Sequence, residues 1–224
     1  MTWAQNILSF YKNLKPPQEL PNSISWLYPQ QQQEVLDVVE SFCGKFYNDQ
    51  RERTLLIGIN PGRLGAGVTG VNFTAPRQLS RYCGIPHSFK DQTELSAEFI
   101  YAVIEAYGGA QKFYSHFFMG SVCPLGFVQN GKNINYYDDK MLLQTVEPFI
   151  IANLEKLVSF QSNRHRCICI GGEKNYKYLS KLNQKHKWFA SIDTLAHPRF
   201  IMQYKRPLKA HFVQQYLDVL KKKQ

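Results

Sequence analysis

Residues 58–73 read G-I-N-P-G-R-L-G-A-G-V-T-G-V-N-F and combine a polar side chain with a high density of glycine. Asn60 follows an apolar run, and five glycines occur between positions 58 and 70. A side-chain amide can orient a water molecule or a polar group of a ligand. Glycine lets the backbone approach a ligand where a Cβ atom would collide with it. The segment therefore predicts a binding loop, either for a nucleotide phosphate or for a single base.

Two phosphate-binding patterns can be aligned with this loop, and each lacks a necessary part. Residues 65–70 match G-x-G-x-x-G, but residues 60–62 separate them from the strand and residues 71–76 do not start a helix. Residues 62–69 have the spacing of a P-loop, with Val68 in place of the lysine that must reach the phosphates. A glycine-rich turn without a ligand leaves the polar Asn60 at the strand end unexplained.

Two later segments also place polar side chains after apolar runs. Ser121 begins S-V-C-P-L, and His197 lies in A-H-P-R. The imidazole of His197 can donate a hydrogen bond to an oxygen that gains negative charge during a reaction, and it can do so in its neutral form. A histidine that caps a turn before Pro198 is the alternative interpretation.

The segment after His197, R-F-I-M-Q-Y-K-R-P, mixes apolar and cationic residues. An exposed apolar tip flanked by cations is typical of a wedge that fills a vacated base stack while the cations bind phosphates. We expect a loop over residues 197–206. The alternative is a hydrophobic segment that packs under the last helix.

The elements that must position these side chains alternate between strands and helices. Apolar runs predict strands at residues 54–59, 117–122, 166–170 and 188–195. Helices are predicted at 3–14, 29–46, 75–82, 94–107, 139–160, 173–182 and 208–222, with a loop or hairpin turning at 130–131. This order indicates an α/β fold, a three-layer sandwich with a mostly parallel four-stranded central sheet. Ligands of such sheets bind beyond the carboxyl ends of the strands, so the loops that begin at 60, 123, 171 and 197 should carry the function.

Length, charge and cysteine usage narrow the class of protein. The 224 residues predict one domain, 1–224, on which residues 1–50 pack as a helical extension. The net charge is +10, and residues 181–224 contain ten basic and two acidic residues, as expected of a protein that binds phosphates.

The five cysteines include no C-x-x-C pair. This argues for a reducing compartment and against disulfides or a zinc or iron–sulfur site. Neither a signal peptide nor a membrane-spanning run is predicted.

The glycine loop, the segment at Ser121 and the segment at His197 resemble three motifs of the single-strand-selective monofunctional uracil-DNA glycosylases, and they occur in the same order along the chain. Residues 58–62, G-I-N-P-G, and 69–73, T-G-V-N-F, resemble G-M-N-P-G and T-G-V-P-F, with the same thirteen-residue step from asparagine to phenylalanine. S-V-C-P-L resembles an element in which asparagine stands two residues before C-P-L. A-H-P-R resembles the start of an H-P-x-P-R loop, which intercalates at the lesion in that family.

The resemblance implies a uracil-DNA glycosylase-like fold and a monofunctional DNA glycosylase that needs neither metal nor cofactor. The enzyme would flip a base out of DNA and hydrolyse its N-glycosidic bond for base excision repair. Asn60 would hold the attacking water, His197 would stabilise the departing base, and Phe73 would stack on it. The other implied base contacts are Ile59, Gly62, Gly65, Ala66, Gly67 and Ser121. The implied DNA contacts are Arg63, Arg199, Phe200, Met202, Tyr204, Lys205 and Arg206.

Two departures from the family pattern bear on substrate choice. Ser121 stands where the family has an asparagine that reads the uracil edge, and the second proline of H-P-x-P-R is absent after Pro198. A serine hydroxyl makes fewer contacts and rotates, so we expect the pocket to accept uracil and also other deaminated bases such as xanthine or hypoxanthine. The departures indicate a divergent bacterial branch of the family. We expect DNA as the partner, no association with a membrane, and a monomer that acts in the cytoplasm, at the nucleoid. A catalytically inactive DNA-binding or lesion-sensing protein on the same scaffold is the alternative, and a nucleotide-binding enzyme is third.

Overall fold

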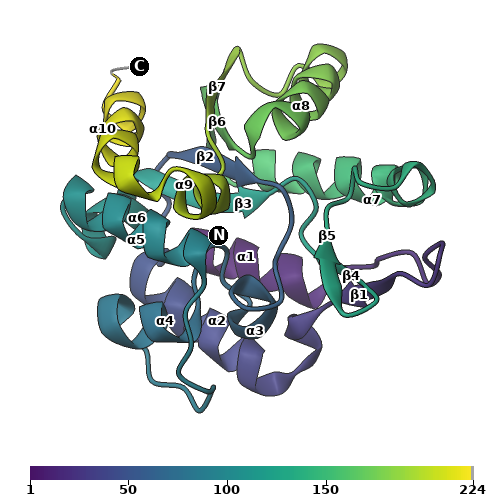
Figure 1. Cartoon of the computed structure of the whole chain (residues 1–224), viewed down its shortest axis with the longest axis horizontal. Coiled ribbons are helices and arrows are strands. Elements are labelled where there is room, and N and C mark those ends of the chain that lie inside the picture. Colours follow the sequence, from purple (N-terminus) through teal and green to yellow (C-terminus); the bar gives the residue numbers. More distant parts are fainter. Residues whose placement is uncertain (223–224) are drawn as a thin grey trace.

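Four parallel strands form the central sheet of the computed structural model, which describes residues 1–222 (Figure 1). Their spatial order is β3 (Phe117–Ser121), β2 (Arg53–Gly58), β6 (Ser162–Ile170) and β7 (Ser191–Leu195). β2 is buried along its whole length, as expected of a strand that is covered on both faces. The predicted α/β sandwich with a parallel four-stranded sheet is confirmed. Lys223 of the basic C-terminal segment lies outside the described residues.

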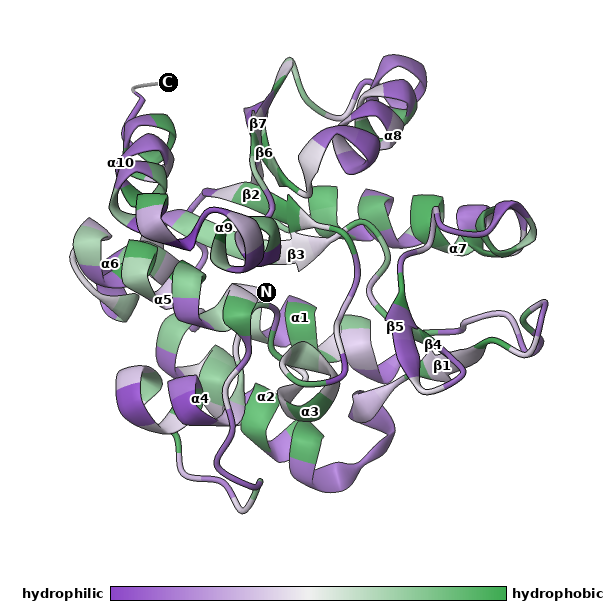
Figure 2. Ribbon diagram, viewed as in Figure 1, coloured by the Kyte–Doolittle hydropathy of each residue, from purple (hydrophilic) through white to green (hydrophobic). Residues whose placement is uncertain are grey.

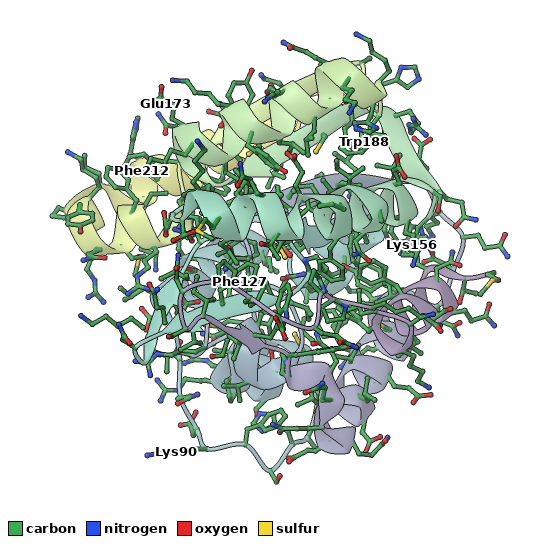
Figure 3. The ribbon with its side chains drawn as sticks, turned by 90° about the vertical axis from the view of Figure 1, so that its right-hand side faces the viewer. Lys90, Phe127, Lys156, Glu173, Trp188 and Phe212 are labelled. Carbon is green, nitrogen blue, oxygen red and sulfur yellow. The ribbon has the colours of Figure 1, made fainter. Side chains whose placement is uncertain are left out.

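Helices cover both faces of this sheet. α7 (Lys140–Val158) and α8 (Gly172–His186) lie on one side, and α5 (Leu95–Tyr107), α6 (Ala110–His116) and α10 (Lys209–Leu220) lie on the other (Figure 1). In Figure 2 the strand β2 is hydrophobic and much of α8 is hydrophilic, which matches a core at the sheet and a solvated outer helix. Figure 3 shows the same division in side chains, with Glu173 at the surface and Phe127 inside the molecule.

The N-terminal residues 1–50 pack against the sheet and also supply a strand to a second, smaller sheet. α1 (Trp3–Lys12) contacts α2 (Gln33–Phe46), and the fully buried Trp3 packs on Phe118 of β3. A short 3-10 helix at Pro29–Gln31 precedes α2. β1 (Ser25–Leu27) pairs with β4 (Gly126–Gln129), which forms a hairpin with β5 (Lys132–Ile134) across the predicted turn at 130–131. This hairpin places residues 133–137 beside the end of β2.

Residues 197–206 differ from the expected loop. They form α9 (Pro198–Tyr204), and a 3-10 helix follows at Arg206–Leu208. His197 is the N-cap of α9 and Pro198 is its first helical residue, where the missing N–H and the fixed φ of proline favour a helix start. The short helices α3 (Ala66–Thr69) and α6 were not predicted, whereas α4 (Pro76–Cys83) lies where a helix was expected.

Candidate active site

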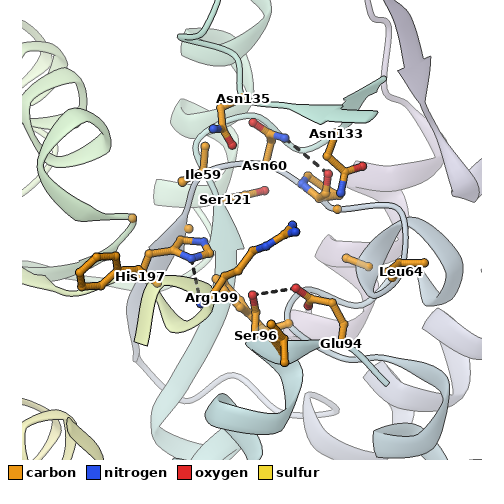
Figure 4. Close-up of a pocket in the computed structure, with 18 of the residues that line it drawn as sticks. Ile59, Asn60, Leu64, Glu94, Ser96, Ser121, Asn133, Asn135, His197 and Arg199 are labelled. Carbon is orange, nitrogen blue, oxygen red and sulfur yellow. Dashed lines mark hydrogen bonds between the residues drawn. The ribbon is translucent and has the colours of Figure 1, made fainter. Parts of the chain in front are cut away.

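The carboxyl ends of β2, β3 and β7 open into one pocket of about 740 Å³, which is within the usual range of small-ligand sites. Gly58 of β2 is the register partner of Ser121 of β3, and His197 follows the end of β7. Asn60, Phe73, Ser121 and His197 all line this pocket. Figure 4 shows Asn60 and Ser121 on one side of it and His197 on another. The structure thus brings together the side chains that sequence reasoning selected from separate loops.

The side-chain amide of Asn60 is held in one orientation by the end of β5 and the residues that follow it. Its Oδ1 accepts a hydrogen bond from the backbone N–H of Tyr136 at 3.1 Å, and its Nδ2 donates to the carbonyl of Ile134 at 3.3 Å. An amide oxygen has two lone pairs, so one remains available to accept a hydrogen bond from water. Asn60 is therefore equipped to orient a water molecule at the pocket.

Ser121 presents an oxygen whose own proton is already engaged. It is buried, with 4% of its surface exposed, and its hydroxyl donates to the carbonyl of Cys123 at 2.7 Å. The lone pairs of the hydroxyl oxygen remain, so Ser121 can accept hydrogen bonds but has no proton left to donate. This observation corrects the expectation of a freely rotating hydroxyl.

Phe73 forms a wall of the pocket in a strained backbone conformation. Its φ is +54°, in the left-handed region that residues with a Cβ seldom adopt, and such strain in a folded protein is concentrated at functional sites. A Cβ atom at position 58 would lie 2.7 Å from Cζ of Phe73, so the ring requires glycine beneath it. The ring centroids of Phe73 and His197 are 6.4 Å apart. The glycine at the end of β2 therefore serves the placement of an aromatic side chain.

The imidazole of His197 is neutral and has one free donor. Its Nδ1 accepts a hydrogen bond from the backbone N–H of Arg199 at 3.1 Å, which assigns the ring proton to Nε2. Burial and, to a smaller extent, the positive charge of Arg199 lower the pKa of His197 to about 4. At neutral pH the ring is therefore an uncharged hydrogen-bond donor at the pocket.

Glycine was expected in this loop because a ligand would approach the backbone, but the structure shows that neighbouring protein atoms also exclude a side chain. A Cβ atom on Gly67 would lie 2.5 Å from a methyl group of Leu27 and 2.8 Å from the carbonyl oxygen of Gly62. A Cβ atom on Gly65 would lie 3.2 Å from a carboxylate oxygen of Glu94. Gly62 and Ala66 line the pocket, whereas Gly65 and Gly67 do not. At residue 67 protein packing alone requires glycine, whereas the contact at residue 65 is with the end of a flexible side chain that can move.

One side of α9 is exposed at the pocket, as a DNA wedge would require, and the other side is buried in the core. Phe200 and Tyr204 are 45% and 65% exposed, and both line the mouth of the pocket together with Arg199. Met202 is only 4% exposed and lies in the core, so the expectation that it contacts DNA is corrected. The helix thus buries one side, as the packing alternative required, and exposes aromatic rings on the other.

The remaining cations predicted to bind DNA lie outside the pocket lining. Arg63, Lys205 and Arg206 are exposed, and a guanidinium nitrogen of Arg206 is 4.0 Å from a carboxylate oxygen of Glu98. These positions are compatible with contacts to flanking phosphates, and their role stays a prediction.

Several residues at the pocket were not found from the sequence. Leu64 is 44% exposed at the pocket, and the hairpin supplies Asn133 and Asn135 to its lining. Glu94 accepts a hydrogen bond from Ser96 at 2.8 Å, and both line the pocket (Figure 4). Leu64 lies in the loop after β2, but its side-chain type gave no signal of a ligand contact. The other four residues follow no central strand, so the rule that ligands meet the carboxyl ends of strands could not select them.

Within residues 1–222, no three His, Cys, Asp or Glu side chains are grouped closely enough to bind a metal ion. None of the helices formed by those residues combines the length and the hydropathy of a membrane span.

Comparison with known proteins shows the family of this chain and a closely similar solved structure. The family described as the Uracil DNA glycosylase superfamily matches residues 45–221. The crystal structure of wild-type SMUG2 from Pedobacter heparinus superposes with a TM-score of 0.94 and 42% sequence identity, covering 99% of this chain and 97% of that one. A search of the curated proteins found no match.

Proposed function

We propose a substrate and a mechanism for this chain on the premise that it belongs to the uracil DNA glycosylase superfamily, as the match to residues 45–221 shows. The chain is a DNA glycosylase, a hydrolase of DNA repair whose substrate is DNA. We propose that it hydrolyses the N-glycosidic bond of uracil and of other deaminated bases, namely xanthine and hypoxanthine. The observation that carries this proposal is the presence of Asn60 and His197 in one pocket.

The pocket is suited to a base that has been extruded from the helix. Flipping a base costs a few kcal/mol, and contacts in the pocket must offset that cost. The ring of Phe73 offers a flat surface, and stacking of a base on an aromatic ring contributes about 1–3 kcal/mol. Phe200 and Tyr204 at the mouth can occupy the space that the base leaves behind.

Two residues then act on the bond itself. As the bond breaks, negative charge develops on the base, and the Nε2–H of His197 donates a hydrogen bond to a base carbonyl oxygen. Positive charge develops on the sugar, and a water held by Oδ1 of Asn60 attacks it. An amide cannot accept the proton strongly, which suits a dissociative reaction in which the sugar cation is already reactive. The contribution of Asn60 is the position of the water, whose proton passes to the departed base anion through solvent.

The state of the Ser121 hydroxyl supports a substrate range that is wider than uracil. Uracil, hypoxanthine and xanthine each carry a ring N–H next to a carbonyl, whereas cytosine and adenine have an unprotonated ring nitrogen at that place. A hydroxyl that only accepts can bind the ring N–H of the deaminated bases and offers no donor to cytosine or adenine. Ser121 therefore disfavours cytosine and adenine without selecting for ring size, and thymine and guanine, which carry the same ring N–H, must be excluded by other parts of the pocket.

The test uses oligonucleotides that each carry uracil, hypoxanthine, xanthine, cytosine or adenine at one position. After incubation and alkali treatment, we expect strand scission at the three deaminated bases and none at cytosine or adenine. The Asn60→Ala protein should bind the uracil oligonucleotide with near-normal affinity and release about 100-fold less base. Absence of scission on every substrate would favour the binding-only alternative.

We also propose that the enzyme acts as a monomer in the bacterial cytoplasm. All five cysteines are free and buried, which is compatible with a reducing compartment.

A further inference from the structure

Two fully buried polar side chains lie next to the pocket and take no part in the chemistry described so far. Tyr136 and Asn175 are both 0% exposed, and the hydroxyl of Tyr136 donates to Oδ1 of Asn175 at 2.7 Å. A buried polar group without a partner costs about 1–3 kcal/mol, so a pair of this kind is retained only where its hydrogen bonds are satisfied.

The side-chain NH2 of Asn175 is directed to the strands that end at the pocket. Its Nδ2 donates to the carbonyl of Gly58 at 3.2 Å and lies 3.3 Å from Sγ of Cys169. Gly58 ends β2 two residues before Asn60, and Cys169 belongs to β6. One side chain from the first turn of α8 therefore joins β2, β6 and the segment that contains Tyr136.

The first of the two glycines after β6 has its explanation in this arrangement. A Cβ atom at Gly171 would overlap with the side-chain amide of Asn175. Gly171 itself lines the pocket. The turn from β6 into α8 thus requires glycine so that the Asn175 amide can fit beneath it, and no ligand is needed to account for residue 171.

The backbone of Tyr136 extends this connection to the candidate water-holding residue. The N–H of Tyr136 is the donor to Oδ1 of Asn60, while the side chain of Tyr136 is fixed by Asn175. We propose that Tyr136 and Asn175 are positioning residues that hold the orientation of the Asn60 amide. They touch neither base nor sugar, and their catalytic effect rests on the function proposed for Asn60.

The physical need for such an anchor follows from where the partners of Asn60 are located. Ile134 is the last residue of β5 in the small hairpin, and Tyr136 belongs to the connection between that hairpin and α7, so both lie outside the central sheet. Connecting segments are more mobile than the elements that they join. A misplacement of 1 Å can lower a rate about 100-fold, so a water-holding amide requires a fixed support.

Tyr136→Phe removes only the hydroxyl that reaches Asn175, and Tyr178→Phe is the matched control. The two rings are 5.0 Å apart, but the Tyr178 hydroxyl donates to Glu147 at 3.1 Å and is outside the connection to Asn60. For uracil DNA we expect Tyr136→Phe to lower the single-turnover rate at least tenfold and to change the dissociation constant less than twofold. Tyr178→Phe should stay within twofold of wild type in both.

A double variant distinguishes positioning from a general loss of structure. In the Asn60→Ala background, Tyr136→Phe should cause no further fall in rate, because the amide on which it acts is absent. The inference is overturned if Tyr136→Phe matches Tyr178→Phe in rate, or if it lowers the rate equally in both backgrounds.

A second readout needs no activity. The side-chain NH2 signals of Asn60, identified in ¹⁵N spectra by their loss in Asn60→Ala, should shift or broaden in Tyr136→Phe and stay unchanged in Tyr178→Phe. Unchanged signals in Tyr136→Phe would reject the positioning role. If wild type released no base from any substrate, the proposed substrate range would fail while these spectra still decided the role of Tyr136.

Discussion

Protonation of His197 is a perturbation whose size and direction can be worked out from the structure. The ordinary pKa of 6.5 falls to about 4 in the folded protein, chiefly because burial disfavours the charged ring and also because Arg199 is close. Since the folded-state pKa is lowered, the unfolded chain takes up the proton first as the pH falls. The folded state is therefore fully stable with respect to this group above pH 6.5 and loses stability between pH 6.5 and 4.

The magnitude follows from the separation between the two pKa values. Between pH 7 and pH 5 the linkage relation gives a loss of about 2 kcal/mol in the free energy of unfolding. His197→Asn is the reference protein, because asparagine can also cap α9 but does not titrate in this range. Urea unfolding of both proteins at the two pH values isolates the contribution of His197 from that of all other groups.

The pH dependence of the catalytic rate should also reflect the lowered pKa of His197. Because the neutral ring is the donor, the single-turnover rate of uracil release by wild type should show no His197 transition between pH 5.5 and 8. His197→Asn should lower the rate about 100-fold at pH 7, because the shorter asparagine side chain does not bring a donor to the place of Nε2–H. An equal pH dependence of stability in both proteins, or a rate that falls with a midpoint near 6.5, would refute the reasoning.

Three further changes test the walls and the mouth of the pocket. Ser121→Asn restores an amide with donors and should narrow the substrate range toward uracil; an unchanged ratio of uracil to hypoxanthine release would show that this position does not read the base. Gly58→Ala forces its new methyl group against Phe73 and should cost about 1–3 kcal/mol in urea unfolding, while Gly44→Ala, whose Cβ meets nothing within 4 Å, should not destabilise the protein. Phe200→Ala should lower the rate on double-stranded uracil DNA more than on single-stranded DNA, since only the duplex has a stack to fill; equal losses would speak against a wedge.

The sequence predicts the parts of the site that follow directly from the parallel sheet. Asn60 and His197 follow the ends of β2 and β7, and Ser121 is the last residue of β3. The carboxyl ends of parallel strands lie at the same edge of a sheet. Their convergence therefore needs only the identification of the strands. The apolar run of β2 made that identification direct, because its residues are buried on both faces.

The support of the site could not be predicted in the same way. Tyr136 and Asn175 are 39 residues apart, and no local pattern marks a tyrosine hydroxyl and an amide as partners. Helix α9 did have a local signal, since Pro198 at the first helical position follows a residue whose side chain can cap. The mixture of apolar and cationic residues in this segment favoured a loop, although the burial of Ile201 and Met202 beside exposed Phe200 and Tyr204 reflects the two sides of a helix.

The central claim is that Asn60 and His197 act on one glycosidic bond from different sides of a single pocket. A crystal structure of the Asn60→Ala protein bound to uracil-containing DNA tests it most directly. We predict that the uridine nucleotide is extruded, with its base stacked on Phe73, a carbonyl oxygen within hydrogen-bond distance of Nε2 of His197, and its C1′ atom facing position 60. A nucleotide that remains in the DNA stack, or a base that binds in a pocket without His197, would contradict the claim.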